Sequence, residues 1–402
     1  MSPASKSAED IRVFGKGNKF PAETPWELAL PGKDCLVAAD VKRAYIGLCS
    51  EINIRISYKH SEVKKLEQTI QAEPQDIKRK RTRDIAVLGI LLLIYQFSAK
   101  LFVYTYYYIA YFIFSGKFSL SWSDVLNYFK DNKDLANSTA FEMAANISIT
   151  AATVLLTLSV ARFAFRIKLS GIFRVDKKGA ATGVKWLSPC FVFNMISSTI
   201  IAFFTNLLST VGVSVPTADF SIKHPSVAAV IMQVAYVVIL APLFEEIIYR
   251  GLIIKMVSPY SKSAAVLISA LSFGLMHGNI PQAASAFCTG LIYAVIALKC
   301  GSIIPTVIIH GLNNLIVNSP DLADAMGIPY NEGVLSLIEI CIGLFGFFMW
   351  CTQYKFIAKF DDTPQGEEKK LSFKSVMTNP LIVIYFCILV FIILWRLFEA
   401  NS

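Results

Sequence analysis

Long apolar runs separated by short polar segments dominate the chain from about residue 85 onward. A helix that spans a bilayer needs about 20 mostly apolar residues, so each run is a candidate span. Nine runs reach or approach that length: about 85–114, 141–165, 186–213, 226–254, 263–278, 282–298, 302–318, 334–354 and 379–397. The fifth to seventh runs are short and closely joined. The pattern therefore predicts an all-α polytopic membrane protein with about eight or nine transmembrane helices.

Composition supports this fold class. Of the 402 residues, 54% are hydrophobic and 17% are charged, whereas soluble domains are about 45–50% apolar and about 25% charged. The net charge of +9 suggests nucleic-acid binding at first sight, but much of it lies in clusters beside apolar runs, where Lys and Arg orient membrane helices. We expect membrane lipids and no nucleic acid as partners. The eight cysteines form no CxxC pair, which argues against a cysteine zinc site.

The basic clusters also predict an orientation. One cluster, 78–83, precedes the first apolar run, and seven Lys and Arg residues lie between 162 and 185, after the second run. Because cytoplasmic loops carry an excess of Lys and Arg, both segments should be cytoplasmic, with the acidic loop at 321–332 on the opposite side. The pattern fits a multi-pass protein of a bacterial plasma membrane and one of the endoplasmic reticulum equally well. Of these two locations we favour the bacterial plasma membrane.

The chain divides into four predicted regions. Residues 1–84 read as a cytoplasmic N-terminal extension, without the apolar core of a signal peptide. Residues 85–185 hold two transmembrane helices and a basic loop, 186–320 form the core that carries the polar residues described next, and 321–402 hold the C-terminal transmembrane helices.

Ionisable residues inside membrane helices are expensive, so each one calls for a partner or a function. The fourth run contains Glu245, Glu246 and Arg250 in the sequence PLFEEIIYR. On a helix Arg250 lies about 40° from Glu246 and about 140° from Glu245. We therefore expect Arg250 to neutralise Glu246 as an i,i+4 pair and to leave Glu245 free.

Further polar groups occur in the fifth and seventh runs. The fifth run ends with Phe273 and His277, and the seventh contains His310, Asn313 and Asn314. His310 and Asn314 share a helix face. At about 1.5 Å of rise per residue, Glu245, His277 and His310 lie about 15, 22 and 12 Å from the cytoplasmic ends of their helices. These depths predict that the groups converge in one catalytic cavity inside the helix bundle.

These motifs resemble those of the CAAX-protease and bacteriocin-processing family of intramembrane proteases, also called CPBP or Abi, which includes the Ras-converting CAAX endopeptidases. The family pattern is EExxxR, FxxxH and HxxxN on successive helices. This chain matches it with Glu245-Glu246-xxx-Arg250, Phe273-xxx-His277 and His310-xxx-Asn314. The resemblance covers roughly residues 185–320.

The resemblance implies hydrolysis of peptide bonds in the membrane. Glu245 matches the glutamate that activates water, and His277 the histidine that assists it. His310 and Asn314 match the pair that stabilises the oxyanion, while Glu246, Arg250, Phe273 and Asn313 are expected to support the site. The substrate would be a hydrophobic peptide or a lipid-modified protein, processed in a CAAX-type or a bacteriocin- or signal-peptide-type reaction.

Two alternatives remain open at this stage. The first is a zinc site made by Glu245, His277 and His310, although the HExxH spacing of many zinc proteases is absent; metal-free catalysis without a cofactor is our preference. The second is a non-catalytic membrane transporter or scaffold, in which a buried Glu/His/Asn site binds an ion or relays protons.

Overall fold

The structure is a computed structural model that describes residues 75–358 and 373–402. The chain divides into units 1–72 and 73–402. The predicted N-terminal extension lies outside the described residues up to residue 74. Within 75–84 the chain is already helical, because its Lys and Arg residues are good helix formers and continue directly into the first apolar run.

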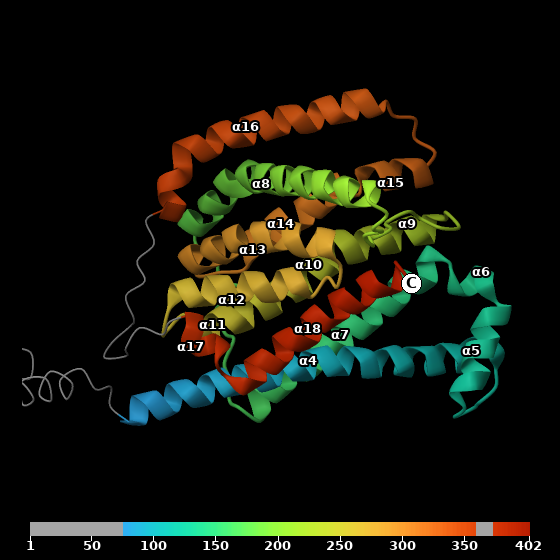
Figure 1. Ribbon diagram of the computed structural model, residues 1–402, viewed down its shortest axis with the longest axis horizontal. Coiled ribbons are helices and arrows are strands. Elements are labelled where there is room, and N and C mark those ends of the chain that lie inside the picture. Colours follow the sequence, from blue (N-terminus) through green and yellow to red (C-terminus); the bar gives the residue numbers. More distant parts are fainter. Residues whose placement is uncertain (1–74, 359–372) are drawn as a thin grey trace, which may run out of the picture. The chain divides into compact units, whose positions relative to one another are not determined.

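The described residues of unit 73–402 form helices joined by loops, and no strand occurs among them (Figure 1). The helices are α4 (Gln75–Ser115), α5 (Trp122–Asp131), α6 (Lys133–Ala136), α7 (Thr139–Phe163), α8 (Lys177–Thr210), α9 (Val227–Val234), η1 (Ala235–Leu240), α10 (Ala241–Glu246), η2 (Ile247–Ile253), α11 (Ile254–Val257), α12 (Lys262–Leu275), α13 (Ile280–Cys300), α14 (Ile304–Val317), α15 (Ser319–Ala325), α16 (Glu332–Ala358), α17 (Phe373–Met377) and α18 (Pro380–Glu399).

The predicted all-α polytopic membrane fold is confirmed. Within 75–358 and 373–402, seven helices are long and apolar enough to cross a membrane: α4, α7, α8, the continuous helix from α9 to α11, α13, α16 and α18. The shorter apolar helices α12 and α14 correspond to the closely joined fifth and seventh runs. Each predicted run therefore coincides with one apolar helix.

The helix from α9 to α11 changes its winding twice. The segments η1 and η2 are π-helical turns on either side of α10, which carries the two glutamates. Pro242 at the start of α10 explains the first, because proline has no N–H to donate to the carbonyl of Val238 four residues earlier. π-Helical turns frequently occur at functional sites. We have no comparable physical account of η2.

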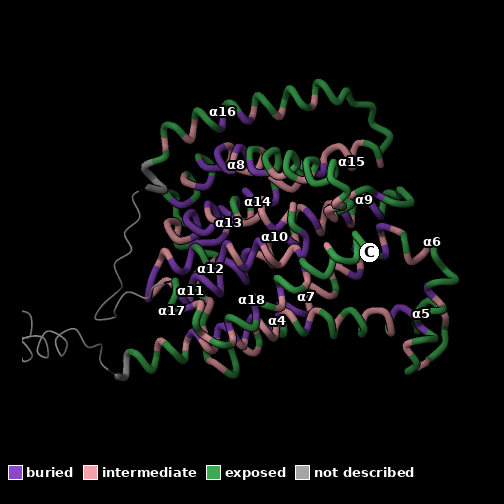
Figure 2. The backbone as a smooth tube through the Cα atoms, viewed as in Figure 1, coloured by how far each residue is buried: buried purple, intermediate pink, exposed green. Residues whose placement is uncertain are grey.

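The centre of the helix bundle is formed by α10, α12, α13 and α14. Figure 2 shows buried backbone concentrated in these elements, whereas α16 is mostly exposed. Half of the most apolar 18-residue stretch of α13 is buried, compared with 11% of the corresponding stretch of α16. Exposed apolar helices suit contact with lipid tails, which are as apolar as the side chains themselves.

Basic segments meet at one end of the bundle. The Cys300 thiol at the end of α13 lies 3.7 Å from the Gly179 carbonyl oxygen at the start of α8, and the Ile303 N–H donates to the Ile172 carbonyl oxygen at 2.8 Å. These contacts place Lys299 beside the basic segment that begins α8. The structure thus gathers the Lys and Arg residues that the sequence assigns to one side of the membrane.

Candidate active site

The two neighbouring glutamates of α10 have different surroundings. The Glu246 side chain is fully buried, and its Oε1 accepts a hydrogen bond from Nη1 of Arg250 at 2.9 Å. The predicted i,i+4 ion pair is therefore confirmed. The Glu245 side chain remains 14% exposed, and no contact joins it to Arg250 in the described structure. Arg250 thus neutralises one carboxylate and leaves the other available.

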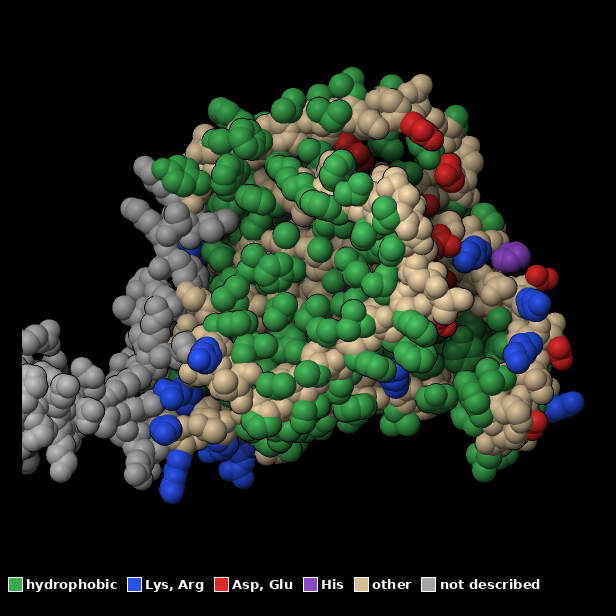
Figure 3. All heavy atoms as spheres, in the orientation of Figure 1, with side chains coloured by type: hydrophobic (Ala, Val, Ile, Leu, Met, Phe, Trp, Pro, Cys, Tyr) green, Lys and Arg blue, Asp and Glu red, His purple; other side chains and the backbone are tan. Residues whose placement is uncertain are grey.

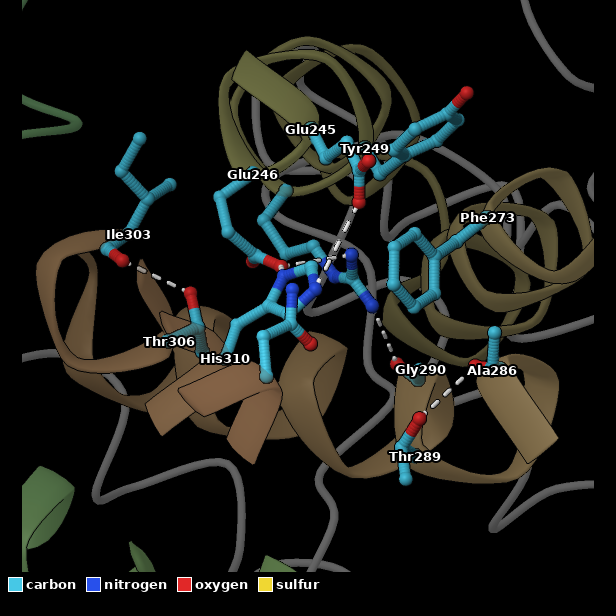
Figure 4. A network of polar contacts seen from close by, with 12 residues as sticks. Glu245, Glu246, Tyr249, Phe273, Ala286, Thr289, Gly290, Ile303, Thr306 and His310 are labelled. Atoms are coloured by element: carbon cyan, nitrogen blue, oxygen red, sulfur yellow. Dashed lines mark hydrogen bonds and ion pairs between the residues drawn. The ribbon is translucent and has the colours of Figure 1, made fainter. Parts of the chain in front are cut away.

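His310 of α14 lies between the two carboxylates (Figure 4). Its Nδ1 is 3.2 Å from Glu246 Oε1, and its Nε2 is 3.7 Å from Glu245 Oε2. The first distance suits a hydrogen bond from Nδ1–H to the carboxylate, whereas the second is too long for one and short enough for a strong charge interaction. Glu246 thereby orients the imidazole so that Nε2 faces Glu245.

Arg250 is held by a second set of contacts. Its Nη2 donates to the Gly290 carbonyl oxygen of α13 at 3.3 Å. The guanidinium lies 4.2 Å from the ring centre of Phe273 and 5.4 Å from that of Tyr293. Such cation–π contacts favour a buried guanidinium. Gly290 lets these groups pack closely, because a Cβ there would lie 3.1 Å from the Phe273 ring and 3.3 Å from Nη2 of Arg250.

Phe273 contacts both histidines of the candidate site. Its ring meets the His277 and His310 imidazoles edge to face, with ring centres 5.3 and 5.4 Å apart. His277 Nδ1 is 2.8 Å from the Phe273 carbonyl oxygen, so Nδ1 carries the hydrogen and Nε2 is left as an acceptor in the neutral ring. In the described residues, no hydrogen bond joins His277 directly to Glu245 or His310.

The two asparagines of α14 take different positions. Asn314 Nδ2 donates to the Val237 carbonyl oxygen of η1 at 2.9 Å, which leaves one hydrogen of the amide for another acceptor. Asn313 Oδ1 is buried without a partner in the described structure. A Cβ at Gly311 would run into the backbone carbonyl of Val238. Gly311 therefore permits the close approach of α14 to η1 on which the Asn314 contact depends.

The zinc alternative fits this arrangement poorly. Across the described chain, no three His, Cys, Asp or Glu side chains form a group that could hold a metal ion. Glu245 and His310 are neighbours, whereas His277 contacts the Phe273 ring and makes no described contact with either of them. The side chains near Phe273 instead offer a carboxylate, imidazoles and hydrogen-bond donors, which are the groups required for acid–base hydrolysis of an amide.

Several residues of the site were not identified from the sequence. They are Val237, Gly290, Tyr293, Thr306 and Gly311. Two signals in the sequence could have found some of them: glycines inside apolar helices mark close helix contacts, and Pro242 inside an apolar run marks freed carbonyls near Val237. Tyr293 and Thr306 carry no such signal, because each could equally face lipid.

Comparison with known proteins identifies a related family. Residues 227–316 match the family model described as type II CAAX prenyl endopeptidase Rce1-like. This segment runs from α9 to α14 and includes every polar group described above. Searches of curated proteins and of solved structures return no match.

Proposed function

We propose that the protein is an intramembrane endopeptidase in which Glu245 activates the attacking water. The premise is that the chain contains a domain of the Rce1-like CAAX prenyl endopeptidase family over residues 227–316. The observation that carries the proposal is the difference between the two glutamates. Glu246 is neutralised by Arg250 at 2.9 Å, while Glu245 is partly exposed and faces His310. A base must be free to accept a proton, and of the two glutamates only Glu245 meets that condition.

The proposed reaction begins with a water molecule between Glu245 and the scissile carbonyl of the substrate. Glu245 takes one proton from the water as the oxygen attacks the carbonyl carbon, and His277 Nε2 orients the water by accepting its other hydrogen. The proton on Glu245 then passes to the leaving amine as the C–N bond breaks. Each proton is accounted for by groups of this chain and by the water.

His310 and Asn314 are proposed to stabilise the oxyanion. In this proposed role His310 carries a hydrogen on both ring nitrogens, with Nδ1–H donated to Glu246 Oε1 and Nε2–H donated to the oxyanion. The second hydrogen of the Asn314 amide supplies another donor. Donors that are fixed before the reaction contribute about 2.7–4 kcal/mol each to stabilising the transition state.

The family description suggests a prenylated substrate. A CAAX sequence lies at the C-terminus of a protein and is prenylated on its cysteine, so the lipid would hold the substrate beside the exposed apolar helices. Bacteriocin-type or signal-peptide-type substrates are alternatives that share the hydrophobic character. We propose metal-free hydrolysis in either case.

Cleavage of CAAX peptides by the purified full-length protein in detergent tests the proposal. Farnesylated and unmodified peptides should be compared for wild type, Glu245→Gln, and Glu339→Gln as a matched carboxylate-to-amide control on α16. We expect Glu245→Gln to lose about 10²–10⁴-fold in activity with the fold intact, and Glu339→Gln to match wild type. An active, folded Glu245→Gln protein would exclude this mechanism.

Two further measurements test the zinc and transporter alternatives. Loss of activity with a chelator and its recovery with zinc would replace the metal-free proposal by the zinc alternative. If no peptide is cleaved by the wild type, ion flux in liposomes tests the transporter alternative, and a Glu245-dependent flux would establish it.

A further inference from the structure

A cavity of about 490 Å³ lies at the basic end of the bundle, away from the glutamates and histidines of the candidate active site. It forms where the first turns of α4 meet the end of α7 and the end of α11. Its lining includes three cations, Lys80, Arg83 and Lys255, and one carboxylate, Asp84. Figure 3 shows Lys and Arg gathered at this end of the molecule, while most Asp and Glu lie toward the opposite end.

The cavity is fixed by contacts of its own lining. The Tyr260 hydroxyl donates to Asp84 Oδ2 at 2.6 Å, and Arg83 Nη2 is 3.2 Å from Asp84 Oδ1. The Tyr260 bond joins α4 to the turn after α11, and the two contacts together satisfy the only carboxylate of the lining. The cations therefore outnumber the negative charge, and Lys255 makes no ion pair with any residue that the structure describes.

The other wall of the cavity is apolar. It consists of Val87, Phe165, Ile167, Met256 and Pro259. Arg166, three residues after the end of α7, has a left-handed backbone with φ of 57°, and Phe165 and Ile167 on either side of it both line the cavity. A site with cations on one side and hydrocarbon on the other matches a phosphate group attached to an acyl chain. Neither a soluble anion nor an apolar peptide needs both.

We propose that this cavity binds the phosphate group of an anionic phospholipid. Basic pockets between transmembrane helices at the positively charged side of a membrane bind lipid headgroups of this kind. The depth of the site in the membrane agrees with this proposal, because the three cations lie at the ends of membrane-spanning helices, where lipid headgroups lie. The proposal does not depend on the endopeptidase activity.

Lipid binding by the purified full-length protein at about 0.15 M salt tests it. Fluorescent phosphatidylglycerol is the probe, and phosphatidylcholine with the same acyl chains is the comparison. The pocket variant carries Arg83→Gln and Lys255→Gln. The matched control carries Lys117→Gln, after the end of α4, and Lys130→Gln, in α5. It removes the same number of positive charges from exposed positions that do not line the cavity.

We expect wild type and the control to bind phosphatidylglycerol more tightly than phosphatidylcholine, and the pocket variant to lose at least roughly tenfold in affinity. Competition with glycerol phosphate distinguishes the two sources of the phosphate. Weak competition identifies the lipid, whereas full competition identifies a soluble phosphate ester as the ligand. Equal losses in the pocket and control variants, or no preference for the anionic lipid, would overturn the site. A thermal unfolding midpoint equal to that of wild type shows that the pocket variant is folded.

Discussion

The helices α14 and α16 are both strongly apolar, yet they occupy opposite situations in the bundle. The buried residues of α14 include His310, which contacts Glu246 of α10, and Gly311, which closely approaches the Val238 carbonyl of η1. On α16 large apolar side chains such as Leu344 and Phe348 are more than half exposed. One helix builds the candidate site, and the other presents hydrocarbon to its surroundings.

This difference shows what hydrophobicity measures in a membrane protein. It identifies the segments that enter the bilayer, but lipid tails are as apolar as leucine, so it does not separate the helices of the core from those at the rim. Polar side chains and glycines make that distinction. Burial of a charge requires a partner, and a close helix contact requires a small residue.

Of the substitutions that test the difference between the core and the rim of the bundle, Glu246→Gln is expected to have the largest effect. The change leaves the Arg250 guanidinium buried without its counter-charge and weakens the acceptor of His310 Nδ1. Breaking a buried pair in this way destabilises by about 3–5 kcal/mol. The free energy of unfolding in mixed micelles measures it, and Glu339→Gln on α16 is the control, with an expected change within about 0.5 kcal/mol.

Equal stabilities of Glu246→Gln and Glu339→Gln would contradict the comparison. They would mean that water compensates Arg250 and that the centre of the bundle is not a dry core. The same variant should also lower activity, because His310 loses the group that fixes its orientation.

Much of the fold was predictable from the sequence. Apolar runs located all the membrane helices, since a bilayer imposes both the length and the composition of a span. The helix from α9 to α11 was predicted as one run, but not its two π-helical turns. The first of these turns follows from the missing N–H of Pro242, and hydropathy does not register it.

Neighbours on a single helix of the candidate site were predictable from the sequence, but the contacts between its helices were not. Helical spacing gave the Glu246–Arg250 pair. It gave no indication that Glu246 also contacts His310, because that contact depends on how α14 packs against α10, 64 residues away along the chain. Spacing fixes neighbours on one helix, whereas contacts between helices depend on packing that a single sequence leaves open.

A smaller effect is expected for Asn314→Ala. If the amide stabilises the oxyanion, kcat should fall by about 10²–10³-fold while KM changes little. The matched control is Asn318→Ala at the C-terminal cap of α14, whose Nδ2 donates to the Asn314 carbonyl oxygen at 2.8 Å. It loses one amide hydrogen bond outside the site. A rise in KM alone for Asn314→Ala would reassign the amide to substrate docking, and equal losses in both variants would indicate a structural role.

The smallest of these effects compares two glycines. A Cβ at Gly311 meets the backbone carbonyl of Val238, which cannot move without displacing η1, whereas a Cβ at Gly343 of α16 lies 2.6 Å from the flexible end of Met195. Gly311→Ala should therefore destabilise by about 1–3 kcal/mol and Gly343→Ala by less than about 0.5 kcal/mol. Thermal unfolding in detergent measures both. The displaced α14 would also stretch the bond between Asn314 and Val237, so activity should fall only for Gly311→Ala. If both variants unfold alike, α14 is no more tightly held than α16, and the division between core and rim is wrong.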